Sequence, residues 1–148
     1  MVDEATEAAV EVEAEAEDQA EPEIEVDVRG QVTAPLDGVD YVLRPSEEAI
    51  LAAERQCGCS LHVLTEKATY SRLTLDEMAI IVTEMMRAHG KADSSAGPSY
   101  SGAKVERVRT MIYEAGAPRI TARLVVLLRG ALTGGFTASG EWKASGTN

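Results

Sequence analysis

The residues of this chain that could do chemistry at short spacing are two cysteines and a histidine. Cys57 and Cys59 are separated by one glycine, and His62 follows three residues later. Thiolates and imidazoles are zinc ligands, but a structural zinc site needs four of them. His89, the second histidine of the chain, is far away in the sequence. We therefore predict no metal site and interpret the cysteines as buried or half-buried small side chains at a helix end.

No motif typical of an enzyme is present. The chain has no glycine-rich phosphate loop, no GxSxG, no HExxH and no pair of CxxC motifs. Serine, histidine and carboxylate residues occur, but nothing in their spacing brings them together. We expect a protein that is not an enzyme, with no catalytic residues, no cofactor and no metal.

Charge divides the chain into an acidic arm and a nearly neutral body. Residues 1–28 contain 12 Asp/Glu and no Lys/Arg, whereas residues 29–148 contain 13 Asp/Glu and 14 Lys/Arg. The arm therefore carries −12 and the body +1, which sum to the net charge of −11. Low hydrophobicity with high net charge predicts disorder. Solubility is the simplest role for such an arm, and occupation of a basic surface is the alternative.

The clearest element that could position these groups is a helix at Leu73–Gly90. Thr74 and Glu77 have the spacing of a capping box at its start. Apolar residues then recur at helical spacing and form a wide apolar face. Gly90 is placed to end the helix.

A β-hairpin and four further helices account for most of the remaining pattern. The hairpin is predicted at Arg29–Arg44 with its turn at Leu36–Gly38, and it should pack on the helices or add to another sheet edge. Capping residues and apolar spacing predict the helices, and a stretch of Ser, Gly and Pro predicts a loop at Lys91–Gly102. The four helices are expected at Pro45–Gly58, Ser60–Tyr70, Lys104–Ala115 and Pro118–Leu132.

We predict a mainly α (α+β) fold, a small bundle of about five helices with an N-terminal β-hairpin. Residues 1–28 would be a disordered acidic arm, residues 29–135 the helical domain and residues 136–148 a loose, flexible tail. No cationic region opens the chain, and its apolar runs are far shorter than the ~20 residues of a membrane span. Two cysteines cannot form a disulfide framework. We expect a cytoplasmic protein that binds neither membranes nor nucleic acid.

Two features suggest a protein partner. Methionines are adaptable side chains that suit surfaces accepting varied helices, although filling the core is their commoner role. The second half of the body is basic, because residues 87–129 hold eight Lys/Arg against three Asp/Glu. A solvated face is the simpler interpretation of that charge. The candidate partner-binding residues are Met78, Met85, Met86, Leu124, Leu128, Arg119 and Arg123, the last two lying one turn apart on one face.

The order of the predicted elements, a hairpin followed by helices, resembles that of a known family. The resemblance covers residues 29–135 and is to the small proteins of bacterial gene transfer agents and related siphophages that are encoded between the tail tube and the tape measure. The residues that carry it are Asp37–Arg44 (DGVDYVLR), a helix with Ala49, Ile50, Leu51 and Glu54, Cys57–Leu64 (CGCSLHVL), Leu73–Met78 (LTLDEM) and the final helix Ala122–Gly135.

The resemblance implies a tail assembly chaperone. Such a protein is helical and non-enzymatic, coats the long tape-measure protein in the host cytoplasm and helps tail-tube subunits to assemble around it. Its partners would be the tape-measure protein and the tail-tube protein, and a homo-oligomer is an option. The alternative is a structural tail component such as a tube subunit, which should be rich in long strands. A third reading, a DNA mimic, would need carboxylates held on a folded surface.

The acidic arm adds a regulatory hypothesis. The arm carries −12 and residues 87–129 carry +5 (8 − 3). Opposite charges on one chain attract at low salt. The arm could therefore fold back on the basic helices until a partner displaces it.

Overall fold

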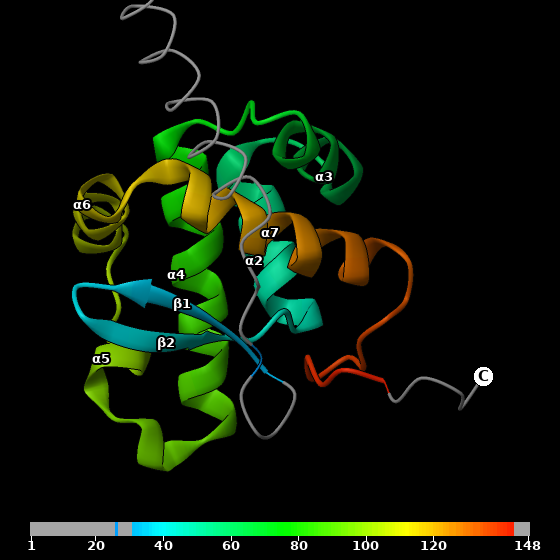
Figure 1. The fold of residues 1–148 in the computed structure, drawn as a ribbon. Helices are drawn as coiled ribbons and strands as arrows, with labels where there is room; N and C mark the ends of the chain where they lie inside the picture. The colour runs from blue at the N-terminus through cyan, green and yellow to red at the C-terminus, as the bar shows by residue number, and fades with distance from the viewer. Residues whose placement is uncertain (1–25, 27–30, 144–148) are drawn as a thin grey trace, which may run out of the picture.

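The computed structural model describes Val26 and residues 31–143 of the 148-residue chain. Among these residues a hairpin comes first and helices follow, so the predicted mainly α fold with an N-terminal hairpin is confirmed (Figure 1). The elements are β1 (Val32–Leu36), β2 (Val39–Leu43), α2 (Glu47–Cys57), α3 (Leu61–Thr69), α4 (Leu75–Ala92), the 3₁₀ turn η1 (Ser94–Ala96), α5 (Pro98–Ser101), α6 (Val105–Ala115) and α7 (Ala117–Leu132).

The hairpin closes through a two-residue turn of Asp37 and Gly38. Both have positive φ, 53° and 75°, which is the type I′ geometry that matches the twist of the flanking strands. The turn sets Leu36 opposite Val39 and Val32 opposite Leu43 in an antiparallel register. A lone hairpin is marginal in water, and here it packs on α4, α6 and α7.

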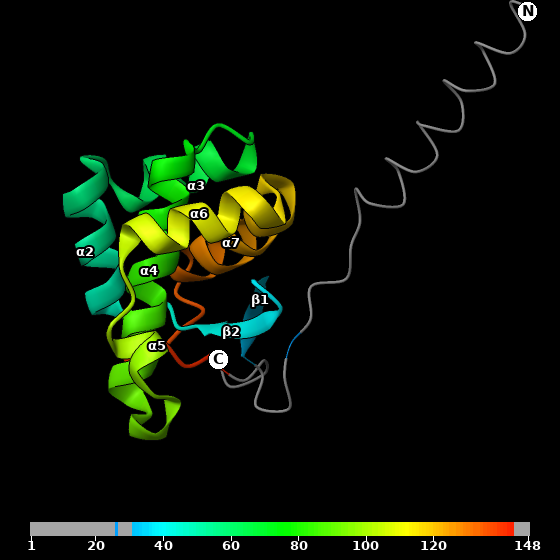
Figure 2. The ribbon, with the colours of Figure 1, turned by 90° about the vertical axis from the view of Figure 1, so that its left-hand side faces the viewer.

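Helix α4 is the centre of the molecule. Its capping box forms as predicted, because Thr74 Oγ1 accepts from the Glu77 N–H at 3.0 Å and Glu77 Oε1 accepts from the Thr74 N–H at 2.9 Å. Helices α2, α5 and α6 and strand β2 all pack on α4, which Figures 1 and 2 show as the long central helix. Its wide apolar face is therefore covered by several neighbours.

The two helices before α4 also begin and end where local rules place them. The Ser46 hydroxyl caps α2 by accepting from the Ala49 N–H at 3.1 Å, and the Ser60 hydroxyl caps α3 by accepting from the Val63 N–H at 3.2 Å. Gly58 ends α2 with a left-handed φ of 73°. Such short-range chemistry is visible in the sequence.

The predicted end of the central helix at Gly90 is wrong. Helix α4 continues through Gly90 to Ala92, and the predicted loop at 91–102 contains η1 and α5. A Cβ on Gly90 would lie 2.8 Å from the backbone nitrogen of Ser101. Glycine is needed here because α5 crosses the helix at close range.

The first part of the predicted tail, residues 136–143, makes specific contacts with the rest of the protein, and we call it the C-terminal strap. Phe136 and Trp142 form a β-bridge with their ring centroids 4.8 Å apart. The Ala138 carbonyl accepts from the Glu47 N–H at 2.8 Å, and the Ser139 carbonyl accepts from Arg44 Nε at 2.7 Å. The remainder of the predicted tail, 144–148, and all of the predicted acidic arm apart from Val26 lie outside the described residues.

No helix in the described part of the chain combines the length and apolar character needed to cross a bilayer. The longest helix, α4, spans Leu75–Ala92 and carries charged residues in its first and last turns. Its apolar side chains pack against other elements of the protein.

Candidate interaction site

The five apolar residues predicted to bind a partner lie in the core. Each is at most 3% exposed. In the folded body they act as packing side chains, so a partner could reach them only if the helices moved apart. They are Met78, Met85 and Met86 of α4 and Leu124 and Leu128 of α7.

The two predicted basic residues have different surroundings. Arg123 is 6% exposed, and its guanidinium donates to the Thr33 carbonyl at 2.7 Å and to the Arg119 carbonyl at 2.9 Å. It ties the hairpin to α7. Arg119 is exposed and has no ion pair within the described residues. Only Arg119 of the pair is therefore on the surface as expected.

Both outer edges of the hairpin are occupied. Hydrogen-bonded and non-bonded pairs alternate from the turn, so Thr33 and Val42 direct their backbone groups outward. The Thr33 carbonyl accepts a hydrogen bond from Arg123, and the Val42 N–H donates one to the Tyr100 hydroxyl at 2.9 Å. Val26 forms a β-bridge with Val32. Pro35 on the same outer edge has no N–H to offer. The edges are thus poorly suited to pairing with a long strand from another subunit.

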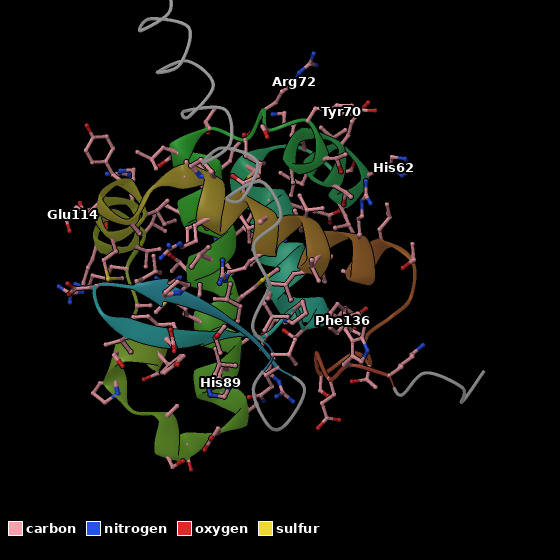
Figure 3. All side chains as sticks on the ribbon, viewed as in Figure 1. His62, Tyr70, Arg72, His89, Glu114 and Phe136 are labelled. Carbon is pink, nitrogen blue, oxygen red and sulfur yellow. The ribbon has the colours of Figure 1, made fainter. Side chains whose placement is uncertain are left out.

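The cysteines form no metal centre in the described residues. No group of three or more His, Cys, Asp or Glu side chains there is arranged to hold an ion. Figure 3 shows His62 pointing outward from α3, while His89 belongs to α4 and lies near the hairpin. Burial, together with the carboxylate of Glu77, raises the pKa of Cys57 to about 11. That thiol stays protonated near neutral pH and is a poor nucleophile.

An apolar groove is the best candidate for a protein contact. It has a volume of about 310 Å³ and lies between α2, the start of α3, the end of α7 and the strap. Leu51 on its wall is 43% exposed, and Leu132, next to the lining residue Ala131, is 38% exposed. The groove is lined by Pro45, Glu47, Ile50, Leu51, Leu61, Ala131, Phe136, Thr137 and Ala138.

Sequence reasoning missed this groove because its walls are distant in the chain. Leu51 belongs to a predicted helix, whereas Phe136 belonged to the predicted loose tail. Figure 3 shows Phe136 pointing from the strap toward the helices, where its ring lies close to Gly130 of α7. A lone aromatic residue beyond the last helix was the available signal, since a large apolar side chain tends to find cover.

A larger hollow of about 600 Å³ lies between the hairpin, the end of α4 and the strap. Its walls carry charged side chains, and Arg44 there already contacts Ser139 and, at 3.8 Å, Glu141. A partner that covered this hollow would have to desolvate those charges. The apolar groove has one charged lining residue, Glu47, and is the more favourable surface for an apolar side chain.

Comparison with known proteins adds one finding. A family model described as phage tail tube protein, GTA-gp10, matches residues 29–134. The match includes the hairpin and every described helix, and it ends just before the strap. No curated protein and no solved structure matches the chain.

Proposed function

Since the chain belongs to the family described as phage tail tube protein, GTA-gp10, we propose that it is a non-enzymatic structural component of a phage-like tail. The family match over residues 29–134 is the observation that carries this proposal. The description supports a structural tail role more directly than the assembly-chaperone role that the sequence resemblance implied. The coarser expectation, a tail-related protein of gene transfer agents and phages, is confirmed.

In this proposal the apolar groove receives a side chain from a neighbouring tail protein. Leu51, Leu132 and Phe136 present apolar surface at or near the groove. Removing such surface from water contributes roughly 25 cal/mol per Å². A neighbouring tail-tube protein, or a second copy of this chain, could insert an aliphatic or aromatic anchor there, as at other protein interfaces.

The assembly-chaperone role is the second candidate, and one feature of the fold supports it. In the described residues the only sheet is the two-stranded hairpin, and its edges are occupied by Arg123, Tyr100 and Val26. A ring built by strand pairing needs free edges. A small helical protein with an apolar groove suits instead the transient covering of a tape-measure helix.

Mass spectrometry of purified particles separates the two candidates. A structural component should be recovered in fixed proportion to the tail-tube protein. A chaperone should be missing from finished particles but should co-purify with the tape-measure protein from cells that lack the tube protein. Absence from both samples would contradict both candidates.

A matched pair of surface variants tests the groove itself. Leu51→Glu places a charge on the groove wall, whereas Tyr113→Glu changes a residue that is 76% exposed on α6. We expect Leu51→Glu to reduce co-purification of the tail partner about tenfold or more and Tyr113→Glu to leave it near wild type. Equal effects of the two variants would contradict a role for the groove.

A further inference from the structure

The outer surface of α7 carries positive charge that nothing in the described structure balances. Arg119, Ala122, Val126 and Arg129 are spaced three, four and three residues apart and therefore line one side of the helix. We call these four residues the α7 stripe. The two arginines are exposed and the two apolar residues are half-buried. Figure 1 shows α7 in the front layer, with α2 and α4 behind it.

The charge of the α7 stripe is not neutralised within its own helix. Helix α7 contains three arginines and no acidic residue. Neither Arg119 nor Arg129 forms an ion pair with any residue that the structure describes. The surface therefore suits a strongly acidic segment whose apolar residues are small, because Ala122 and Val126 offer contact without a deep pocket.

The chain itself contains such a segment. Residues 1–25 hold eleven Asp/Glu, which is the 12 of residues 1–28 less Asp27, and no Lys/Arg. Between these acids the segment is mainly alanine and valine. Its charge and its small apolar side chains thus complement the α7 stripe.

The point at which this segment joins the described structure lies near α7. Val26 forms an antiparallel bridge with Val32 of β1. Val32 is followed by Thr33, whose carbonyl accepts a hydrogen bond from Arg123 of α7 at 2.7 Å. Arg119 lies one turn before Arg123 in the same helix.

The segment is long enough to reach the whole α7 stripe. Helix α7 has 16 residues and is about 24 Å long. A 25-residue segment can extend to about 80 Å. Its attachment beside β1 gives it a high effective concentration at this surface, on the order of millimolar.

We propose that the α7 stripe is a docking surface whose occupant is the acidic segment of the same chain, residues 1–25. Carboxylates of the segment pair with Arg119 and Arg129, and its Ala and Val methyl groups cover Ala122 and Val126. Ion pairs between exposed groups are individually weak and are screened by salt. The segment is therefore exchangeable, and a more acidic partner or higher salt displaces it.

Zero-length carbodiimide crosslinking of the full chain tests this proposal. The reagent joins carboxylates to amines, so the variants Arg119→Lys and Arg129→Lys each place a reactive amine on the α7 stripe. Arg55→Lys is the matched control, since Arg55 is exposed on α2 without an ion pair to any described residue. Crosslinked monomer is isolated, digested and mapped by mass spectrometry.

We expect crosslinks from residues 1–25 to positions 119 and 129 at five or more times the yield at position 55. The yield should fall several-fold between 50 and 500 mM NaCl, and it should vanish when the eleven acids become Asn or Gln. Equal yields at all three positions would overturn the proposal. Crosslinks found only in dimers would also overturn it, because the occupant would then be a second copy.

Discussion

Helices α4 and α7 are both long and apolar, but they are packed in different ways. Helix α4 has ten buried residues among 18, and these include the polar Thr83 and His89. Helix α7 has six buried residues among 16, and its outer side carries Arg119 and Arg129. The central helix has neighbours on several sides, whereas α7 packs mainly on α3 and β1.

This difference shows that an apolar helix need not be a fully buried one. A helix in the middle of a small bundle uses its apolar residues for the core. A helix at the periphery uses one side for the core and leaves the other for contacts. The surfaces that we assign to interaction, the groove and the α7 stripe, both involve α7, and neither lies on the central helix.

The largest expected effect distinguishes the two sides of α7. Leu124 is fully buried, so Leu124→Ala should lower the free energy of unfolding by about 3 kcal/mol through lost burial and a residual cavity. Val126 is half-buried on the outer side, and Val126→Ala should cost less than about 1 kcal/mol. Urea denaturation measures both. Similar losses would mean that α7 is packed on both sides.

The next effect tests close packing on α4. Gly90→Ala should gain about 1 kcal/mol of helix propensity. It also forces a Cβ to within 2.8 Å of the Ser101 backbone nitrogen, and overpacking of this kind costs about 1–3 kcal/mol. We expect a net loss of about 1 kcal/mol in the free energy of unfolding, measured by thermal or urea denaturation. A more stable variant would show that α5 can move away freely.

Substitution of Gly130 in α7 should change the free energy of unfolding less than substitution of Gly90 in α4. A Cβ on Gly130 would lie 2.5 Å from Phe136 Cε2 and 3.2 Å from Trp142 Cζ3, so side chains rather than backbone must shift. For Gly130→Ala we expect a stability change below about 1 kcal/mol, because helix propensity offsets part of the strain. Trp142 is the sole tryptophan, so a changed emission spectrum should report the displaced strap. An unchanged spectrum would contradict the described contact.

The smallest effect concerns pH at the start of α4. Burial alone would raise the pKa of Glu77, but hydrogen bonds from Lys67 at 2.7 Å and from the Thr74 N–H hold its pKa below the ordinary value of 4.5. A carboxyl with a lower pKa in the folded state stabilises the protein above pH 4.5. That contribution is lost as the pH falls through the folded pKa.

The variant Glu77→Gln measures this contribution. We expect it to lower stability at pH 7 by less than about 1 kcal/mol, because the pair is partly exposed to solvent. It should also reduce the stability loss between pH 5 and pH 3, as followed by thermal unfolding. Helix α7 has no acidic residue in its first turn and offers no equivalent group. An unchanged pH dependence would show that the Lys67–Glu77 pair contributes nothing measurable.

The elements that sequence reasoning predicted well are those governed by neighbours in the chain. Ser46, Ser60 and Thr74 cap their helices, and Asp37–Gly38 forms the hairpin turn. Each depends on side chains within about four residues. The failure at Gly90 has the opposite origin, because the reason for a glycine there is contact with Ser101 of α5 rather than helix termination.

The candidate site was less predictable for the same reason. Met85 and Leu124 were proposed for partner contact, and both are buried. Phe136 was assigned to a loose tail, yet it helps to form the wall of the groove. Amphipathic spacing identifies which side chains need cover, but a partner and the protein's own core satisfy that need equally well.

The amino-acid sequence by itself determined the helices, the hairpin, the division of charge between residues 1–28 and the body, and the tail-protein family. These follow from local hydrogen bonding, from apolar spacing and from motifs read along the chain. Only the tertiary structure decided that α4 is enclosed, that Arg123 joins the hairpin to α7 and that no other described element covers one side of α7. The exposure of a side chain depends on which distant segments pack against it. A face that the core buries and a face that binds a partner show the same apolar pattern in the sequence, because the hydrophobic effect drives the burial of both.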